Sequence, residues 1–75
     1  MAIVRTRSGR IPGTPLRNRK WETIAHELVC GNDKYDAVRI AGYSTDRSGF
    51  RSNARRLCAR GDIRERVAEL QDKAV

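Results

Sequence analysis

The first hydrophobic stripe of the chain has apolar residues at intervals of three and four positions, which is the spacing of an amphipathic α-helix. Its members are Trp21, Ile24, Ala25, Leu28 and Val29. Thr14 and Pro15 are typical of a helix start, because a threonine can cap the first turn and proline fits the first helical position. We therefore expect a helix that begins near Thr14-Pro15, or a few residues later, and ends at Gly31.

A second, shorter helix is predicted directly after Gly31. Asn32 or Asp33 can cap its start, and Gly42 can end it because glycine adopts positive φ without strain. Tyr43 follows in what we expect to be a tight turn, where its ring would fill the angle between two helices. The apolar contacts of this helix would come from Tyr35, Ala37, Val38, Ile40 and Ala41.

The third helix is expected to begin between Ser44 and Ser48 and to end near Ala59. Its apolar side consists of Phe50, Ala54, Leu57 and Cys58. With about 100° between successive residues, the opposite side combines small residues with guanidinium groups. That side is formed by Ser48, Ser52, Arg55, Arg56 and Ala59, with Arg47 and Arg51 on one flank and Arg60 on the other.

The fourth helix is predicted from a stop and a start that lie close together. Gly61 would stop the third helix, and Asp62 with Glu65 has the spacing of a capping box for the next one. The inward stripe would be Ile63, Val67 and Leu70. The sequence shows no alternating strand pattern, and its 75 residues suffice for one small domain. We therefore expect an all-α fold, a small helix-turn-helix bundle of about four helices over residues 15–75.

The N-terminal residues 1–14 lack an amphipathic period and have low hydrophobicity. Such a segment buries too little apolar surface to offset the entropy lost on ordering, so we expect a disordered, flexible basic arm. Up to residue 20 the chain carries six basic residues and no acidic one. We expect them to neutralise DNA phosphates, and the arm to enter the minor groove. These residues are Arg5, Arg7, Arg10, Arg17, Arg19 and Lys20.

Positive charge is concentrated in two places, which indicates a DNA-binding domain. The net charge is +7. Residues 1–20 form one basic segment, and residues 44–60, with five arginines and one aspartate, form the other. Concentrated positive charge attracts a polyanion, and arginine favours bidentate contacts with phosphate or guanine. A helix of this kind fits the major groove of double-stranded DNA. We expect base contacts from Ser48, Arg51, Ser52 and Arg55, with Arg47 beside them, and phosphate contacts from Arg56 and Arg60.

The residues do not favour catalysis or metal binding. His26 lies within a helix beside Glu22 and Glu27, where a partly buried or surface histidine is expected rather than a general base. Cys30 and Cys58 are not in a C-x-x-C pair, so we expect reduced, buried thiols, and no fourth zinc ligand is evident. We predict no enzyme, no catalytic residue, no metal and no cofactor. No apolar run approaches the roughly 18 residues of a membrane helix, so we expect no membrane partner.

Most of the chain, over roughly residues 14–70, resembles the N-terminal domain of phage terminase small subunits. The resemblance is carried by Gly31-Asn32, Ala37-x-x-Ile40-Ala41-Gly42-Tyr43-Ser44, Arg56-Leu57-Cys58 and Ile63-Arg64-Glu65-Arg66-Val67-Ala68-Glu69-Leu70. In that family the domain is a helix-turn-helix that recognises packaging-site DNA. The resemblance implies the terminase large subunit as a partner, homo-oligomers in a full-length context, and a cytoplasmic location in a bacterial host, with the protein encoded by a phage or prophage. The stretch from Ser44 to Leu57 is longer than the family's usual pattern, which leaves the register of the third helix open.

Two other functions fit the same residues. A helix-turn-helix transcriptional regulator would share the fold and the basic helix, and sequence alone separates it poorly from a packaging protein. A basic protein-interaction adaptor would instead dock its positive surface on an acidic partner without binding DNA. The salt dependence of DNA affinity distinguishes the adaptor from the two DNA-binding alternatives.

Overall fold

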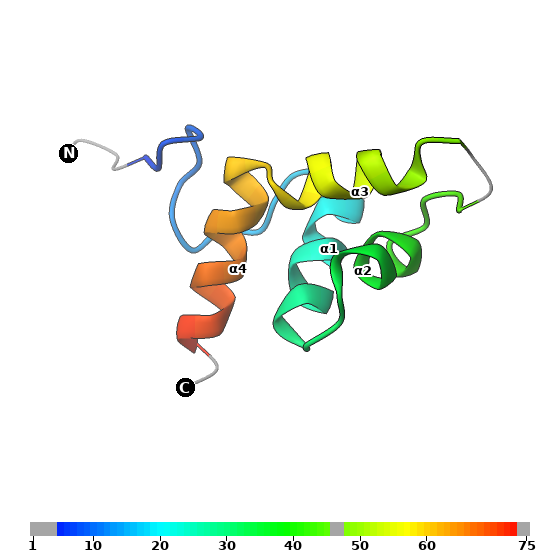
Figure 1. Ribbon diagram of the computed structural model, residues 1–75. Coiled ribbons are helices and arrows are strands. Elements are labelled where there is room, and N and C mark those ends of the chain that lie inside the picture. The colour runs from blue at the N-terminus through cyan, green and yellow to red at the C-terminus, as the bar shows by residue number, and fades with distance from the viewer. Residues whose placement is uncertain (1–4, 46–47, 74–75) are drawn as a thin grey trace.

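Four helices form the protein in the computed structural model, which describes residues 5–45 and 48–73 (Figure 1). They are α1 (Arg19–Val29), α2 (Lys34–Ile40), α3 (Phe50–Cys58) and α4 (Gly61–Lys73). No strand occurs within these described residues. The prediction of an all-α fold with about four helices is confirmed.

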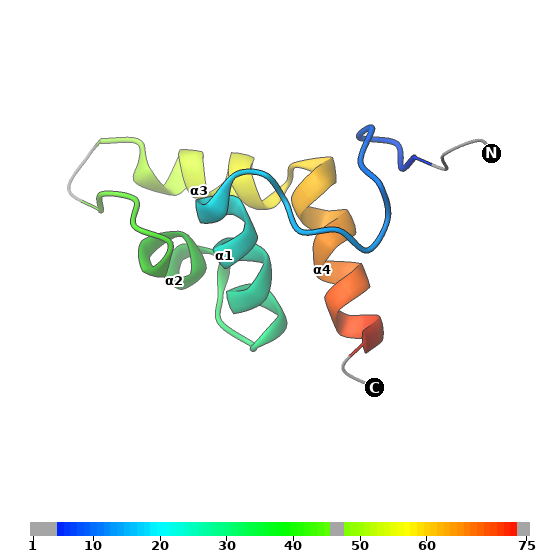
Figure 2. The same ribbon diagram turned by 180° about the vertical axis from the view of Figure 1, so that it is seen from behind.

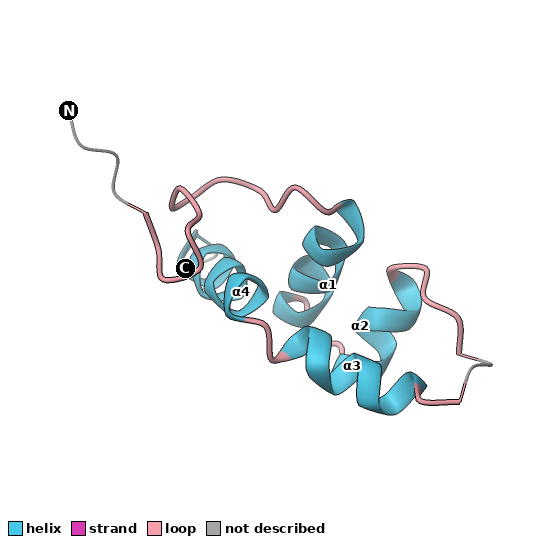
Figure 3. Ribbon diagram, turned by 90° about the horizontal axis from the view of Figure 1, so that it is seen from above, coloured by secondary structure: helices cyan, strands magenta, loops and turns pink. Residues whose placement is uncertain are grey.

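The helices pack around α1, which contacts both α2 and α4. Figure 2 shows the chain that precedes α1 crossing the back of the molecule, and Figure 3 shows α1 between α4 and α2, with α3 running along one side. The predicted stripes supply most of the core, because their small and branched side chains face one another between the helices. The buried apolar residues are Leu16, Ile24, Ala25, Ala37, Val38, Ala54, Leu57 and Ile63.

The first helix begins at Arg19, a few residues after Thr14-Pro15. Asn18 is the N-cap, and its side-chain oxygen accepts hydrogen bonds from the backbone N–H groups of Lys20 and Trp21 at 3.0 and 3.3 Å. Leu16 precedes the helix, is buried in the core, and donates its N–H to the Glu22 carboxylate at 3.0 Å. The later of the two predicted starts is therefore the observed one.

Two glycines end the first two helices as predicted. Gly31 and Gly42 have φ values of +100° and +104°, a conformation that glycine adopts without the steric penalty of a side chain. After α2, the Gly42 N–H donates to the Arg39 carbonyl at 3.0 Å and the Tyr43 N–H donates to the Val38 carbonyl at 3.3 Å. This pair of bonds is a Schellman motif, which satisfies the last carbonyls of the helix and turns the chain sharply.

The start of α3 is later than predicted. The helix begins at Phe50, because Gly49 immediately before it has φ +90°, which is incompatible with a helical residue. Residues 41–49 therefore connect α2 to α3, a longer connection than the tight turn that we expected.

The predicted junction between α3 and α4 was wrong in two respects. Gly61 is the first residue of α4 and does not stop α3, which has already ended at Cys58. Asp62 and Glu65 do not form a capping box. The Asp62 carboxylate accepts hydrogen bonds from Arg60 and from the backbone N–H of Ile63, not from that of Glu65. The Glu65 carboxylate accepts hydrogen bonds from Ser8 and Arg10 and none from the Asp62 N–H.

The segment before α1 contacts α4 through side chains. Ser8 donates from its hydroxyl to Glu65 at 2.8 Å, and Arg10 donates to Glu69 at 2.9 Å. The predicted flexibility of residues 1–14 stays a prediction, and residues 1–4 lie outside the described part. The contacts nevertheless give Arg10 carboxylate partners within the chain.

Candidate nucleic-acid interface

The outward face of α3 carries the residues predicted to contact bases. Arg51, Ser52, Arg55 and Arg56 are all exposed, whereas Ala54 and Leu57 on the opposite side are buried in the core. Ser48 precedes the helix and is exposed, and Arg47 lies outside the described residues. Every described member of the predicted α3 surface is therefore accessible to a ligand.

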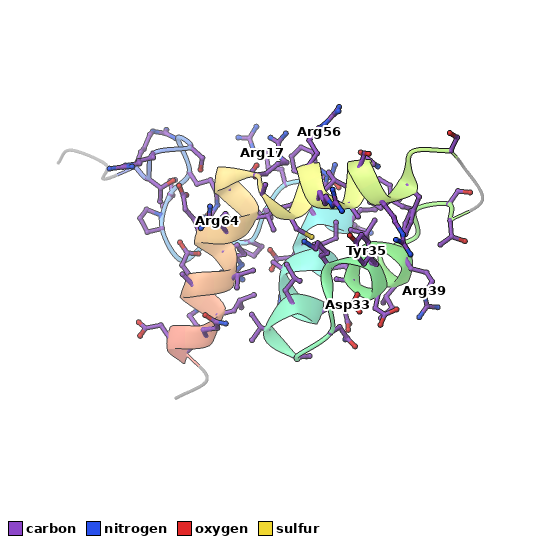
Figure 4. The ribbon with its side chains drawn as sticks, in the orientation of Figure 1. Arg17, Asp33, Tyr35, Arg39, Arg56 and Arg64 are labelled. Carbon is purple, nitrogen blue, oxygen red and sulfur yellow. The ribbon has the colours of Figure 1, made fainter. Side chains whose placement is uncertain are left out.

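The guanidinium groups of α3 are free of carboxylates within the described chain. Arg51, Arg55 and Arg56 form no ion pair with a described acidic residue. Figure 4 shows Arg56 projecting from the upper side of the molecule, as Arg17 from the segment before α1 also does. Because no described acidic residue pairs with Arg51, Arg55 or Arg56, the exposed face of α3 retains its positive potential.

Tyr35 on α2 holds two of these arginines and was missed by the sequence reasoning. Its hydroxyl accepts a hydrogen bond from Arg55 Nε at 3.4 Å, and the Arg51 guanidinium carbon lies 5.5 Å from the ring centroid. The hydrogen bond from Arg55, together with the nearby positive charges, lowers the pKa of Tyr35 below its ordinary value. The sequence predicted only apolar contacts for Tyr35, as part of the second helix. The spacing of Arg51 and Arg55, one helical turn apart, was the available signal that both could reach one partner.

Arg60 differs from the other basic residues near α3. Its Nε donates to the Asp62 carboxylate at 3.1 Å, and its guanidinium lies 4.0 Å from the centroid of the Trp21 ring. An ion pair and a cation–π contact both hold this side chain against the protein. Arg60 therefore presents less free charge than Arg56, and its predicted phosphate contact stays a prediction.

The basic residues of the N-terminal segment fall into two groups. Arg5, Arg7, Arg17, Arg19 and Lys20 are exposed, and the Lys20 ammonium lies 4.8 Å from the centroid of the Tyr43 ring. Arg10 is different, because only 11% of its side chain is exposed and its guanidinium pairs with Glu65 and Glu69. The hydrogen bonds that Arg10 donates to these carboxylates, the one to Glu69 above all, raise the pKa of Arg10. In this arrangement Arg10 serves the fold and is not available to a phosphate.

A second charged cluster joins α1 to α4. The guanidinium of Arg66, which is 5% exposed, donates from Nε and Nη2 to the Glu22 carboxylate at 3.0 to 3.1 Å. Burial alone would raise the pKa of Glu22, but hydrogen bonds from Arg66, the Leu16 N–H and His26 together hold it below its ordinary value. Arg66 also approaches Glu69 at 3.4 Å, so this ion pair continues into the contacts of Arg10. The cluster is structural and holds the N-terminal segment, α1 and α4 together.

Tyr43 occupies the corner that the sequence indicated. It is half-buried, and its hydroxyl accepts a hydrogen bond from the Trp21 indole N–H at 3.1 Å. The bond ties α1 to the connection that follows α2. Trp21 is half-buried and packs against the core, as expected of an anchor of the first helix.

The histidine and the two cysteines differ in their surroundings. His26 Nε2 lies 2.9 Å from the Glu22 carboxylate on the surface of α1. Cys58 is half-buried and burial raises the pKa of its thiol, whereas Cys30 is exposed, so the expectation that both thiols are buried was wrong. Within residues 5–45 and 48–73, no three His, Cys, Asp or Glu side chains are grouped to hold a metal ion, and no helix is long and apolar enough to cross a membrane.

Comparisons with family models, curated proteins and solved structures found no match to this chain. The exposed surface of α3 is therefore the main indication of function.

Proposed function

We propose that this chain is a double-stranded DNA-binding module that inserts α3 into the major groove. The observation that carries the proposal is the exposed set of α3 arginines, Arg51, Arg55 and Arg56, none of which pairs with a described carboxylate. Surface helices usually mix charges of both signs, whereas this face combines guanidinium groups with the small side chain of Ser52. A helix with such a face matches the width and the negative potential of the groove.

The serines and arginines of the proposed interface are assigned roles according to the contacts that each side chain makes. Ser48 and Ser52 are small and exposed, so they allow the backbone of α3 to approach base edges closely. Arg51 and Arg55 are steadied by Tyr35 and are suited to base contacts. Phosphate contacts would come from exposed side chains without a described partner. These are Arg56, Arg17, Arg19 and Arg7.

The biological context that fits best is viral DNA packaging, through the resemblance to terminase small subunits. One copy of a domain this small offers less interface than the roughly 1,000–2,500 Å² typical of specific DNA complexes, so we propose that it acts as a homo-oligomer. A terminase large subunit would then be its protein partner. A transcriptional regulator with the same fold would bind DNA through the same face and differ in its target site.

The proposal is tested by measuring duplex DNA affinity as salt is raised. For the wild type, the logarithm of affinity should fall linearly with the logarithm of salt concentration, with a slope of about −0.9 per phosphate contacted. The Arg51→Ala/Arg55→Ala double variant should bind more weakly by at least tenfold, since each arginine supplies roughly 1–3 kcal/mol when it contacts a base.

The matched control is Arg39→Ala on α2. Arg39 is also an exposed arginine, 59% of its side chain being accessible, but it pairs with Asp36 and is not on the α3 face. This variant should bind DNA as the wild type does. Circular dichroism should show that all three proteins are helical. Weak wild-type binding that does not respond to salt would contradict the proposal and favour an adaptor that docks on an acidic protein.

A further inference from the structure

Arg55 is held by one particular part of its guanidinium group. Its Nε–H donates to the hydroxyl of Tyr35 at 3.4 Å, and Tyr35 belongs to the neighbouring helix α2. We propose that Arg55 is a specificity-determining residue that recognises guanine in the major groove, a proposal that rests on the proposed function. Tyr35 is the positioning residue that orients Arg55.

The chemistry follows from the donors that remain. A guanidinium has five N–H donors in one plane, and the bond to Tyr35 uses the one on Nε. The two terminal nitrogens, Nη1 and Nη2, carry the other four N–H donors, and neither makes a hydrogen bond with a described residue. Guanine presents two adjacent acceptors, N7 and O6, at its major-groove edge. This pair matches the fork formed by the Nη1 and Nη2 donors of Arg55.

The other bases fit this fork less well. Adenine places a donor, its N6 amino group, beside N7, so one N–H of Arg55 would face another donor. Cytosine presents a donor, and thymine presents a single acceptor beside a methyl group. A phosphate could also accept two N–H groups, so charge alone does not establish base recognition. The hydrogen bond between Arg55 and Tyr35 is the feature that favours a base edge at one position.

Tyr35 reduces the freedom of both arginines before any ligand arrives. The Arg51 guanidinium lies 5.5 Å from the Tyr35 ring centroid while Arg55 bonds to its hydroxyl, so a single side chain restrains two long, otherwise mobile groups. Arginine carries a large rotamer entropy that binding must remove, and restraint in the free protein lowers that cost. Arg56 on the same helix has no such partner among the described residues, which suits a phosphate contact that tolerates many orientations.

The experiment uses duplexes that the full chain itself selects from a random double-stranded pool. Each selected duplex is remade with 7-deazaguanine, which removes the N7 acceptor and leaves the phosphates and base pairing in place. We expect the wild type to bind the modified duplex about tenfold more weakly, because the bidentate contact loses one of its two acceptors. Arg55→Lys should show a smaller difference between the two duplexes, because an ammonium group lacks the planar pair of donors that matches N7 and O6, while its salt slope stays the same because its charge is kept.

Tyr35→Phe tests the positioning role, because it keeps the ring beside Arg51 and removes only the hydroxyl that binds Arg55. It should reduce the tenfold preference to about threefold. Adding Tyr35→Phe to Arg55→Lys should change the preference no further, since Tyr35 acts through Arg55. Tyr43→Phe is the matched control: it removes the other hydrogen-bonded tyrosine hydroxyl, on the side of Trp21, and should leave the preference intact.

Three other outcomes would each overturn a different part of the proposal. Equal wild-type affinity for the two duplexes, or an undiminished preference in Arg55→Lys, would overturn guanine recognition by Arg55 while leaving salt-dependent DNA binding in place. A full preference in Tyr35→Phe would overturn the positioning role alone. If no duplex is recovered from the pool and the wild type binds none of it at low salt, the proposed function fails together with this inference.

Discussion

Arginines in two regions of this molecule have opposite surroundings, although they are the same residue type. At the junction of α1, α4 and the N-terminal segment, Arg10 and Arg66 are largely buried and bound to glutamates. On α3, Arg51, Arg55 and Arg56 are exposed and none is bound to a described carboxylate. This difference shows that the number of basic residues overstates the positive charge that is available to a ligand. The neighbours of each arginine decide whether it stabilises the fold or remains available for DNA.

The strongest test of this contrast is Arg66→Ala. It would leave the carboxylate of Glu22, a group with 18% of its side chain exposed, without its main partner at the α1–α4 contact. Breaking a buried ion pair in this way costs roughly 3–5 kcal/mol, so we expect the free energy of unfolding to fall by about 3 kcal/mol or more. Urea denaturation followed by circular dichroism measures it. A loss below about 0.5 kcal/mol, the range of ordinary surface substitutions, would show that this arginine is not structural.

Acid should weaken the same junction. The pKa of Glu22 and of Glu69 is lowered in the folded protein, so their contribution to stability is complete above the ordinary value of 4.5 and is lost as pH falls through the lowered pKa values. We expect the melting temperature to be steady near neutral pH and to fall below about pH 4.5. A melting temperature that stays constant from neutral pH down to about pH 3 would contradict the coupling of these carboxylates to folding.

A smaller effect is expected at Arg10. Arg10→Ala removes the contacts with Glu65 and Glu69 that fasten the N-terminal segment to α4, and we expect a loss of about 1 kcal/mol in the free energy of unfolding. Arg7→Ala, an exposed position in the same segment, is the matched control and should have almost no effect on stability. Equal unfolding curves for both variants would show that the segment is not held through Arg10.

The smallest effect on stability should come from the α3 face. Arg51→Ala and Arg55→Ala remove exposed side chains whose described contacts are only with Tyr35, so each should change the free energy of unfolding by less than about 0.5 kcal/mol. Thermal melts of the two variants provide the measurement. Destabilisation as large as that of Arg66→Ala would remove the distinction between the two regions.

The features that sequence predicted well are local ones. The apolar stripe containing Ile24, and the helix ends at Gly31 and Gly42, depend on residues within a few positions of one another, where helical periodicity and glycine conformation suffice. The predicted start of α3, between Ser44 and Ser48, was too early, because these serines and Gly49 are all compatible with a turn. Only the positive φ of Gly49 shows that the helix begins after it.

The features that sequence missed depend on contacts between distant residues. Glu22 and Arg66 are 44 positions apart, and Arg10 and Glu69 are 59 apart, so no local pattern indicates that their charges meet. Tyr35 and Arg55 are separated by 20 positions and meet only because α2 packs against α3. The sequence therefore placed the candidate site on a face of one helix that the structure shows to be exposed, whereas the side chain that contacts its arginines could be found only from the fold.

The most direct test of the account is a titration of isotopically labelled protein with duplex DNA, followed by NMR of backbone amides and arginine Nε–H groups. We predict that the largest shift changes fall on the α3 backbone and on the Nε–H signals of Arg51, Arg55 and Arg56. The Nε–H signals of Arg10 and Arg66 should stay where they are. Changes confined to Arg10, Arg66 and α4, or no change at saturating DNA, would contradict the claim that α3 is the nucleic-acid surface.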